Sequence, residues 1–302
     1  MSRVYVAPIS FGLGDLVVSL PAIQAVIAQG GRHGEETWLV ARSDAQARLA
    51  DRIAGLAGWV DEQSFDRDDH DGRLVDLRDH PLQRDWWWGS PEFEDAFGAL
   101  SINDILSRIC TDFGIDADFT RPIPMAACPR PELSSSVLLV TESDGPSKQW
   151  SVDRWKSLAD GLGARGLDGR LVTRDEAAPE MSALGIAEAR VPSPGDALDV
   201  LGAARAVVGI DTGLTHLAVQ QGTPTVTIFR APAVFFRPWS HARAVVGDRC
   251  DDTCIAAETE YAYNDQVDLR GLQWRPRKCP VAGRCLNSVH PGDVLGALDN
   301  VL

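Results

Sequence analysis

The residues of this sequence that are best suited to chemistry gather where a buried apolar strand pattern gives way to a helix, within 207–218. Asp211 ends the strand, and Thr212 and Gly213 begin the helix. A helix N-terminus presents unpaired N–H groups and the positive end of the helix dipole, so it binds phosphate readily. His216 follows on the first turn and can point to the same place. We therefore predict a phosphate site made by these four residues.

A second turn that can do chemistry lies near the N-terminus, at Gly14 and Asp15. It follows an apolar strand pattern, 4–9, and precedes a helix-length apolar pattern, 16–28. A strand, a glycine turn and a helix in this order are typical of nucleotide-binding units, although the full dinucleotide fingerprint is absent. The Asp15 carboxylate can serve as a general base, or it can cap the helix that follows. The pattern alone leaves both roles open.

Lys148 is a third candidate, because the chain has only three lysines and this one stands in a loop after an apolar strand pattern, 137–140. A flexible ammonium group in such a loop suits a phosphate or ribose contact. The alternative is an ordinary exposed surface charge. Trp87, the middle of three consecutive tryptophans, is either an aromatic plug beneath a long loop or a platform on which the sugar ring of an acceptor stacks.

These candidates need elements that hold them, and strand and helix patterns alternate through both halves of the chain. A proline-rich stretch, 122–131, separates the halves. Such alternation predicts the α/β class, with parallel sheets covered on both faces. Ligands in these folds bind outside the carboxyl ends of the strands, and a cleft between two domains is the natural site. The segment 237–284 carries no regular pattern, and a last helix is expected over 294–302.

The composition excludes several classes of partner. The net charge is −14, and a nucleic-acid partner would require a basic face instead. The same charge disfavours an anionic lipid surface. No run approaches the roughly 20 apolar residues that a membrane span needs. The N-terminal segment lacks the layout of a signal peptide, so we expect a cytoplasmic protein.

Four of the six cysteines occur late, in two pairs: Cys250 with Cys254, and Cys279 with Cys285. In a cytosolic protein such a set more often binds a metal or stays reduced than forms disulfides. The four thiolates could hold a tetrahedral zinc or iron ion within an irregular loop. The spacing leaves reduced structural cysteines equally open.

Taken in order, these motifs resemble those of the bacterial heptosyltransferases, glycosyltransferase family 9. Residues 14–23 resemble the family's N-terminal signature, and 148–155 resemble its lysine–tryptophan segment ahead of a helix. The block Asp-Thr-Gly-Leu-Thr-His within 209–218, followed by 222–225, resembles its most specific motif. Residues 285–298 resemble its C-terminal ending.

The resemblance implies a GT-B fold, in which two Rossmann-like domains with parallel sheets face a central cleft. The first domain, 1–130, would bind the acceptor. The second, 131–302, would bind a nucleotide sugar, and the last helix, 291–302, could pack back on the first domain. Some relatives that act on proteins carry an iron site, which gives the four late cysteines a possible counterpart. Catalysis in the family needs no metal or other cofactor.

By the same resemblance, Asp15 is the base, and Gly14 and Trp87 lie on the acceptor side. Lys148, Thr212, Gly213 and His216 would contact the diphosphate. Asp211 would orient the sugar or hold the turn. Glu180 lies roughly where the family places a carboxylate near the ribose, with Glu176 as its competitor.

We therefore expect an inverting, metal-independent glycosyltransferase that moves a sugar, with heptose favoured, from an ADP-sugar to an acceptor hydroxyl. The acidic chain favours a small soluble natural-product acceptor over the anionic lipopolysaccharide core. One alternative is a nucleotide-sugar epimerase or hydrolase of the same fold, which would turn over the donor with no acceptor present. Another is a non-catalytic nucleotide-sugar binder, in which Asp15→Asn would change nothing.

Overall fold

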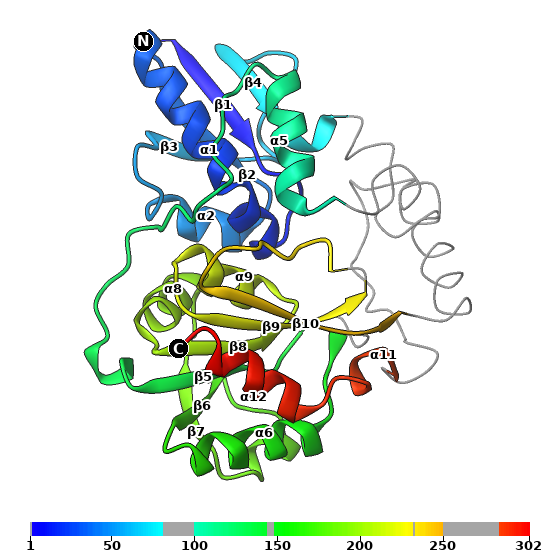
Figure 1. Cartoon of the computed structure of the whole chain (residues 1–302). Coiled ribbons are helices and arrows are strands. Elements are labelled where there is room, and N and C mark those ends of the chain that lie inside the picture. Colours follow the sequence, from blue (N-terminus) through cyan, green and yellow to red (C-terminus); the bar gives the residue numbers. More distant parts are fainter. Residues whose placement is uncertain (1, 81–99, 144–147, 232, 250–283) are drawn as a thin grey trace.

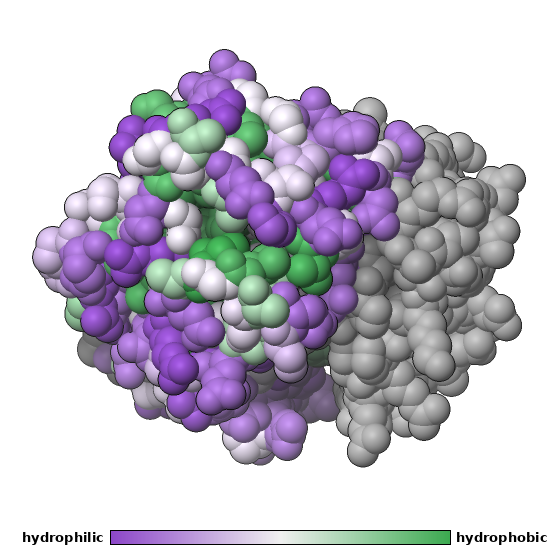
Figure 2. All heavy atoms as spheres, turned by 90° about the horizontal axis from the view of Figure 1, so that it is seen from below, coloured by the Kyte–Doolittle hydropathy of each residue, from purple (hydrophilic) through white to green (hydrophobic). Residues whose placement is uncertain are grey.

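The computed structural model describes residues 2–80, 100–143, 148–231, 233–249 and 284–302. They form two α/β units, one above the other in Figure 1, and each is built on a parallel sheet. The α/β class expected from the alternating patterns is confirmed. Seen from below, the second unit presents mostly hydrophilic residues, with a patch of hydrophobic residues near the middle of the view (Figure 2).

The first sheet has the strand order β3-β2-β1-β4, with every neighbouring pair parallel. Its strands are β1 (Arg3–Ala7), β2 (Glu36–Ala41), β3 (Gly58–Asp61) and β4 (Gly72–Asp76). Its helical elements are α1 (Leu13–His33), α2 (Asp44–Ala50), the 3-10 turn η1 (Leu77–Asp79) and α5 (Ile102–Asp112). The chain order reverses between β1 and β4, which makes that gap the switch point of the sheet.

The second sheet has the order β10-β9-β8-β5-β6-β7 and is also parallel throughout. Its strands are β5 (Ser136–Val140), β6 (Asp168–Thr173), β7 (Ala187–Arg190), β8 (Ala206–Ile210), β9 (Thr225–Ala231) and β10 (Ala242–Arg249). Its helices are η2 (Pro131–Leu133), α6 (Val152–Ala164), α7 (Pro179–Ser182), α8 (Pro194–Ala203), α9 (Gly213–Gln220), α11 (Arg284–Asn287) and α12 (Pro291–Asp299). Counted along the chain, this is the 3-2-1-4-5-6 order of doubly wound dinucleotide folds, with the switch point between β5 and β8.

Helix α1 is a core helix of the first unit. Within the described residues it meets the length and composition needed to cross a membrane, so the expectation that no segment reaches that length is wrong. Ten of its 21 residues are nevertheless buried in the protein. The helix begins at Leu13, so the glycine turn is already its first turn. It continues through Pro21, which is buried in its interior.

Two further expectations are corrected. Strand β10 lies inside the segment that carried no regular pattern, because an edge strand has a half-solvated outer side and shows only a weak apolar signal. The last helix, α12, does not pack back on the first domain. It contacts α6, β8, β9 and β10, and Val294, Leu295 and Leu298 are buried in the core of the second unit.

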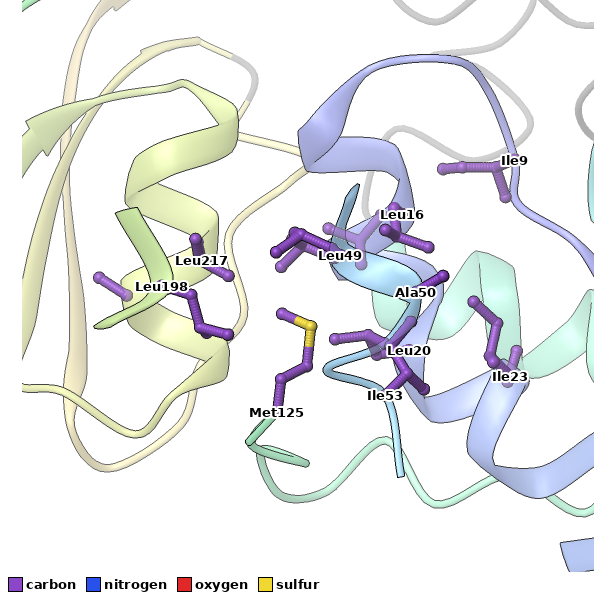
Figure 3. Packing of buried hydrophobic residues seen from close by; sticks show 14 of the residues in the cluster. Ile9, Leu16, Leu20, Ile23, Leu49, Ala50, Ile53, Met125, Leu198 and Leu217 are labelled. Atoms are coloured by element: carbon purple, nitrogen blue, oxygen red, sulfur yellow. The ribbon is translucent and has the colours of Figure 1, made fainter. Parts of the chain in front are cut away.

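One hydrophobic core runs through both units (Figure 3). Leu16 and Leu20 from α1 belong to the same buried cluster as Leu198 from α8 and Leu217 from α9. Met125, from the segment that joins the units, lies between them. This shared cluster makes much of the interface apolar, of the kind that keeps two domains docked.

Polar contacts fix the joining segment to the second unit. The Gln221 side chain accepts a hydrogen bond from the Met125 N–H at 2.7 Å and donates one to the Met125 carbonyl at 3.1 Å. Asp199 accepts from the Cys128 N–H at 2.7 Å and forms an ion pair with Arg52 of the first unit at 3.2 Å. These bonds satisfy backbone groups that the interface would otherwise bury unpaired.

Because the core is shared, Leu217→Ala should weaken the whole molecule and not only the second unit. We expect the free energy of unfolding to fall by about 2–5 kcal/mol through lost burial and the cavity left behind. Denaturant unfolding followed by tryptophan fluorescence and by circular dichroism should keep one coincident transition at a lower midpoint. Leu302→Ala, at an exposed terminal residue, is the control. Separate transitions for the two probes would show that the units unfold independently.

Candidate functional site

Each sheet places polar side chains at its own switch point. In the first sheet, Asp15 follows β1 and Arg78 follows β4. In the second, Lys148 follows β5 and Asp211 follows β8. The carboxyl ends of parallel strands at such a point form the usual ligand-binding crevice of these folds. The chain therefore carries two charged pairs in equivalent topological positions, one in each unit.

The two halves meet through the first turns of α1 and α9. A Cβ atom added to Gly213 would lie 2.8 Å from the backbone nitrogen of Gly14, and one added to Gly14 would lie 3.2 Å from the Gly213 Cα. A side chain at position 213 would collide with the Gly14 backbone, and one at position 14 would be tightly packed, because the two backbones touch. The Gly14 position also lies 3.5 Å from the ring of His216. The structure thus brings together the two glycine-bearing turns that the sequence singled out separately.

Lys148, Asp211 and His216 form one connected group. The Lys148 ammonium donates to the Asp211 carboxylate at 2.8 Å and to the Asp211 backbone carbonyl at 3.2 Å. The other carboxylate oxygen of Asp211 lies 2.8 Å from His216 Nε2. Burial alone would raise the pKa of Asp211, but the Lys148 charge and the His216 hydrogen bond hold that pKa well below its usual range. Asp211 is therefore a carboxylate at every physiological pH.

His216 is held neutral by its surroundings. Burial lowers its pKa, and the charges of Arg237 and Lys148 lower it further, while Asp211 acts in the opposite direction. Since a carboxylate only accepts hydrogen bonds, the neutral ring must carry its proton on Nε2 and donate it to Asp211. The rings of Phe229 and Phe235 lie 6.3 and 5.8 Å from the imidazole. The imidazole therefore orients Asp211 from a largely apolar pocket wall.

Thr212 occupies the N-cap position of α9 without a capping hydrogen bond from its side chain. Its hydroxyl lies 3.4 Å from that of Thr215, which donates to the Ile210 carbonyl. The first N–H groups of α9 have no acceptor within the helix. They and the Thr212 hydroxyl remain suited to an anionic ligand at this end of the helix.

The pKa of the Asp15 carboxyl is raised toward neutral pH. Loss of solvent around the carboxyl raises its pKa to about 6, although the Gly12 N–H, Lys148 and Arg78 pull it down. The Gly12 N–H donates to the carboxylate at 2.9 Å. The capping role is therefore observed, with one oxygen of Asp15 accepting this bond, and the role as a base stays a prediction.

Arg78 is a site residue that the sequence analysis missed. Its guanidinium lies 5.0 Å over the ring of Phe11 and interacts electrostatically with Asp15. Asp76 fixes the turn by accepting from the Arg78 N–H at 2.9 Å, and Asp76 is itself ion-paired with Arg42 and Arg67. The only signal in the sequence was its place directly after a strand pattern. This position becomes informative once the sheet order shows β4 beside β1, because Arg78 then follows the strand next to the one that Asp15 follows.

One predicted residue, Glu180, stands apart from this group. It is exposed on the short helix α7, which follows β6 and not a switch-point strand. Trp87 lies outside the described residues. Of the four late cysteines, only Cys285 is described, and it is buried in the core of the second unit. No group of three or more metal-ligating side chains occurs within the described part of the chain, and the metal site stays a prediction.

The sequence also matches a known family. Residues 111–262 match the profile of glycosyltransferase family 9 (heptosyltransferase). A search of curated proteins finds no significant match.

Solved structures share the fold. A family 9 glycosyltransferase from Veillonella parvula has a TM-score of 0.67 at 11% sequence identity, covering 99% of this chain and 97% of that chain. The E. coli heptosyltransferase WaaC, bound to ADP-2-deoxy-2-fluoro heptose, has a TM-score of 0.57 at 13% identity, covering 87% and 99%. The iron-containing dodecameric glycosyltransferase TibC of enterotoxigenic E. coli has a TM-score of 0.59 at 16% identity, covering 99% and 76%. The expected GT-B fold is confirmed.

The contact between the two glycines gives a direct test of the site's geometry. Gly213→Ala would push a methyl group into the backbone of Gly14, so we expect a loss of about 1–3 kcal/mol in unfolding free energy. Gly31→Ala is the matched control, because nothing lies within 4 Å of its Cβ position on α1 and alanine favours the helix by about 0.5–1 kcal/mol. Thermal denaturation measures both. Equal stability of Gly213→Ala and the wild type would mean that the turns do not touch.

Because the pKa of Asp15 is raised in the folded protein, ionised Asp15 lowers the free energy of unfolding. The folded carboxyl holds its proton to about pH 6, whereas the unfolded chain releases it near its ordinary pKa, so stability falls as pH rises between these values. Asp15→Asn should therefore be more stable than wild type at neutral pH by about 1–2 kcal/mol, and this gain should shrink below the unfolded pKa of about 4. Denaturant titrations across this range provide the measurement. A gain that does not depend on pH would contradict the assignment.

Proposed function

The chain belongs to glycosyltransferase family 9 and is a glycosyltransferase of the GT-B fold, and from this premise we propose that it transfers a sugar from an ADP-sugar to an acceptor hydroxyl. The transfer inverts the anomeric centre, and the favoured sugar is heptose. One observation carries the proposal. Asp15, with a pKa of about 6, stands across the Gly14–Gly213 contact from the Lys148–Asp211–His216 group at the N-terminus of α9.

The second unit is the donor side. The N–H groups that open α9 and the Thr212 hydroxyl would bind the diphosphate, aided by the helix dipole. Lys148 gives two of its N–H bonds to Asp211, so a third stays available for a phosphate oxygen. Its ion pair with Asp211 holds the ammonium at this position. The positive charge comes from the protein, so the proposed chemical step needs no metal.

The first unit is the acceptor side. As the acceptor oxygen forms its bond to the anomeric carbon, Asp15 takes the hydroxyl proton. The bond from the anomeric carbon to the diphosphate oxygen breaks, and its electron pair leaves on the diphosphate. The positive end of α9 and Lys148 stabilise the charge that develops there. The Gly12 N–H, Lys148 and Arg78 each lower the pKa of Asp15 against the effect of burial, and the resulting value of about 6 leaves the carboxyl mostly ionised at neutral pH.

The donor assignment draws on the neighbours, since the WaaC structure holds an ADP-heptose analogue and TibC has been solved with ADP-D-β-D-heptose. The net charge of −14 favours a small soluble acceptor over an anionic membrane surface. We place the enzyme in the cytoplasm, in keeping with a nucleotide-sugar donor. The four late cysteines remain the candidate ligands of a structural zinc or iron ion.

A nucleotide screen tests this function. ADP and ADP-heptose should raise the melting temperature because they bind only the folded state, by about 2.7 kcal/mol of stability at a hundredfold excess over Kd. UDP and GDP should not. Lys148→Met should lose the ADP effect, whereas Lys156→Met should keep it, because Lys156 is exposed on α6 and pairs only with Asp160. Asp15→Asn should bind ADP normally and lose transfer to an acceptor by about 10²-fold or more.

Other outcomes would contradict particular parts of the proposal. Stabilisation by UDP or GDP alone would make the donor assignment wrong. Rapid consumption of ADP-heptose without an acceptor would indicate a hydrolase or an epimerase. Full transfer by Asp15→Asn would remove Asp15 as the base, and unchanged ADP binding by Lys148→Met would move the phosphate site elsewhere.

A further inference from the structure

Arg237 is a buried cation that the proposed reaction does not use. It lies between β9 and β10 and is 2% exposed. Its guanidinium packs 4.8 Å over the ring of Trp239. One terminal nitrogen donates to the backbone carbonyl of His216 at 2.7 Å, and the other donates to the side-chain oxygen of Gln220. Both acceptors belong to α9, so Arg237 binds this helix at its fourth residue and at its last residue.

The charge of Arg237 has no carboxylate partner among the described residues, and its Nε is buried without a hydrogen bond. Burial lowers its pKa to about 9, which still leaves the guanidinium charged at neutral pH. An unpaired buried charge is costly. The carbonyl end of α9 offsets part of that cost, since cations near a helix C-terminus are favourable. A buried guanidinium without a carboxylate partner is therefore expected where its hydrogen bonds hold other groups in a required position.

One contact of Arg237 leads to the Lys148–Asp211–His216 group, and the other leads to the segment that joins the two units. The His216 residue whose carbonyl Arg237 holds also donates to Asp211, which in turn holds Lys148. Gln220 uses its amide nitrogen to donate to the Ile123 carbonyl, at 3.1 Å, in the segment that joins the two units. A shift of Arg237 would therefore change where α9 stands relative to the reacting groups.

We propose that Arg237 is a positioning residue for the diphosphate half of the site. It clamps α9 through the His216 carbonyl and Gln220, so that the first N–H groups of the helix and the Lys148–Asp211–His216 group face the phosphates together. This inference rests on the proposed function, because it assumes that α9 binds the diphosphate. The adenosine part of the ligand does not depend on this clamp.

Calorimetric titration of ADP and of adenosine separates positioning from general stability. We expect Arg237→Met to lower the ratio of ADP affinity to adenosine affinity by about tenfold, the effect of one misplaced charge-assisted hydrogen bond. Arg237→Lys keeps the charge and one bond, and it should restore most of the ratio. Arg243→Met is the matched control, because Arg243 donates only to the nearby Ser240 and Ala242 carbonyls. Its ratio should equal that of wild type.

Gln220→Met keeps the Arg237 charge but removes the side-chain oxygen to which Arg237 donates. It should therefore lower the ratio of ADP affinity to adenosine affinity, even if Arg237→Met fails to fold. In the double variant the loss should not exceed that of Arg237→Met, because the two residues act as one chain of contacts. An unchanged ratio in Arg237→Met or Gln220→Met, or a loss of equal size for ADP and adenosine, would overturn the role of Arg237. A wild-type protein that binds ADP no better than adenosine would instead overturn the proposed phosphate site.

Discussion

The backbone contact between Gly14 and Gly213 is the constraint on which the rest of the site depends. Two helices begin at the same place from opposite units, and a side chain at position 213 would force the Gly14 backbone to shift. The contact brings the first turn of α1, which carries Asp15, against the first turn of α9. The proposed base and the proposed anion-binding helix start thus become parts of one candidate site.

The two half-buried carboxylates on either side of this contact have opposite properties. Asp211 pairs directly with Lys148 and His216, and its pKa falls. Asp15 has one backbone N–H and only distant cations, so desolvation prevails and its pKa rises. Carboxyl groups whose pKa values are pushed apart in this way can divide the work of a site. One stays ionised to hold the site together, and the other can exchange a proton near neutral pH.

The shared core explains how this arrangement persists. Leu16 and Leu20 pack in one buried cluster with Leu198 and Leu217, and Met125 of the joining segment fills the space between them (Figure 3). The Gln221–Met125 bonds and the Arg52–Asp199 ion pair lie along the same interface. Separating the units would expose this apolar surface to water, which opposes wide opening. The site is therefore largely formed before any ligand arrives.

The sequence by itself determined the α/β class, most strand and helix positions, and the residues Asp15, Lys148, Asp211, Gly213 and His216 as candidates, because each follows a local strand pattern. It could not identify Arg78, since a lone arginine after a short strand has meaning only when β4 is seen beside β1. Nor could it identify Arg237 or β10, which depend on distant partners. Which strands are neighbours, which helix starts touch and which charges are buried were decided by tertiary packing alone, because these follow from contacts between segments far apart in the chain.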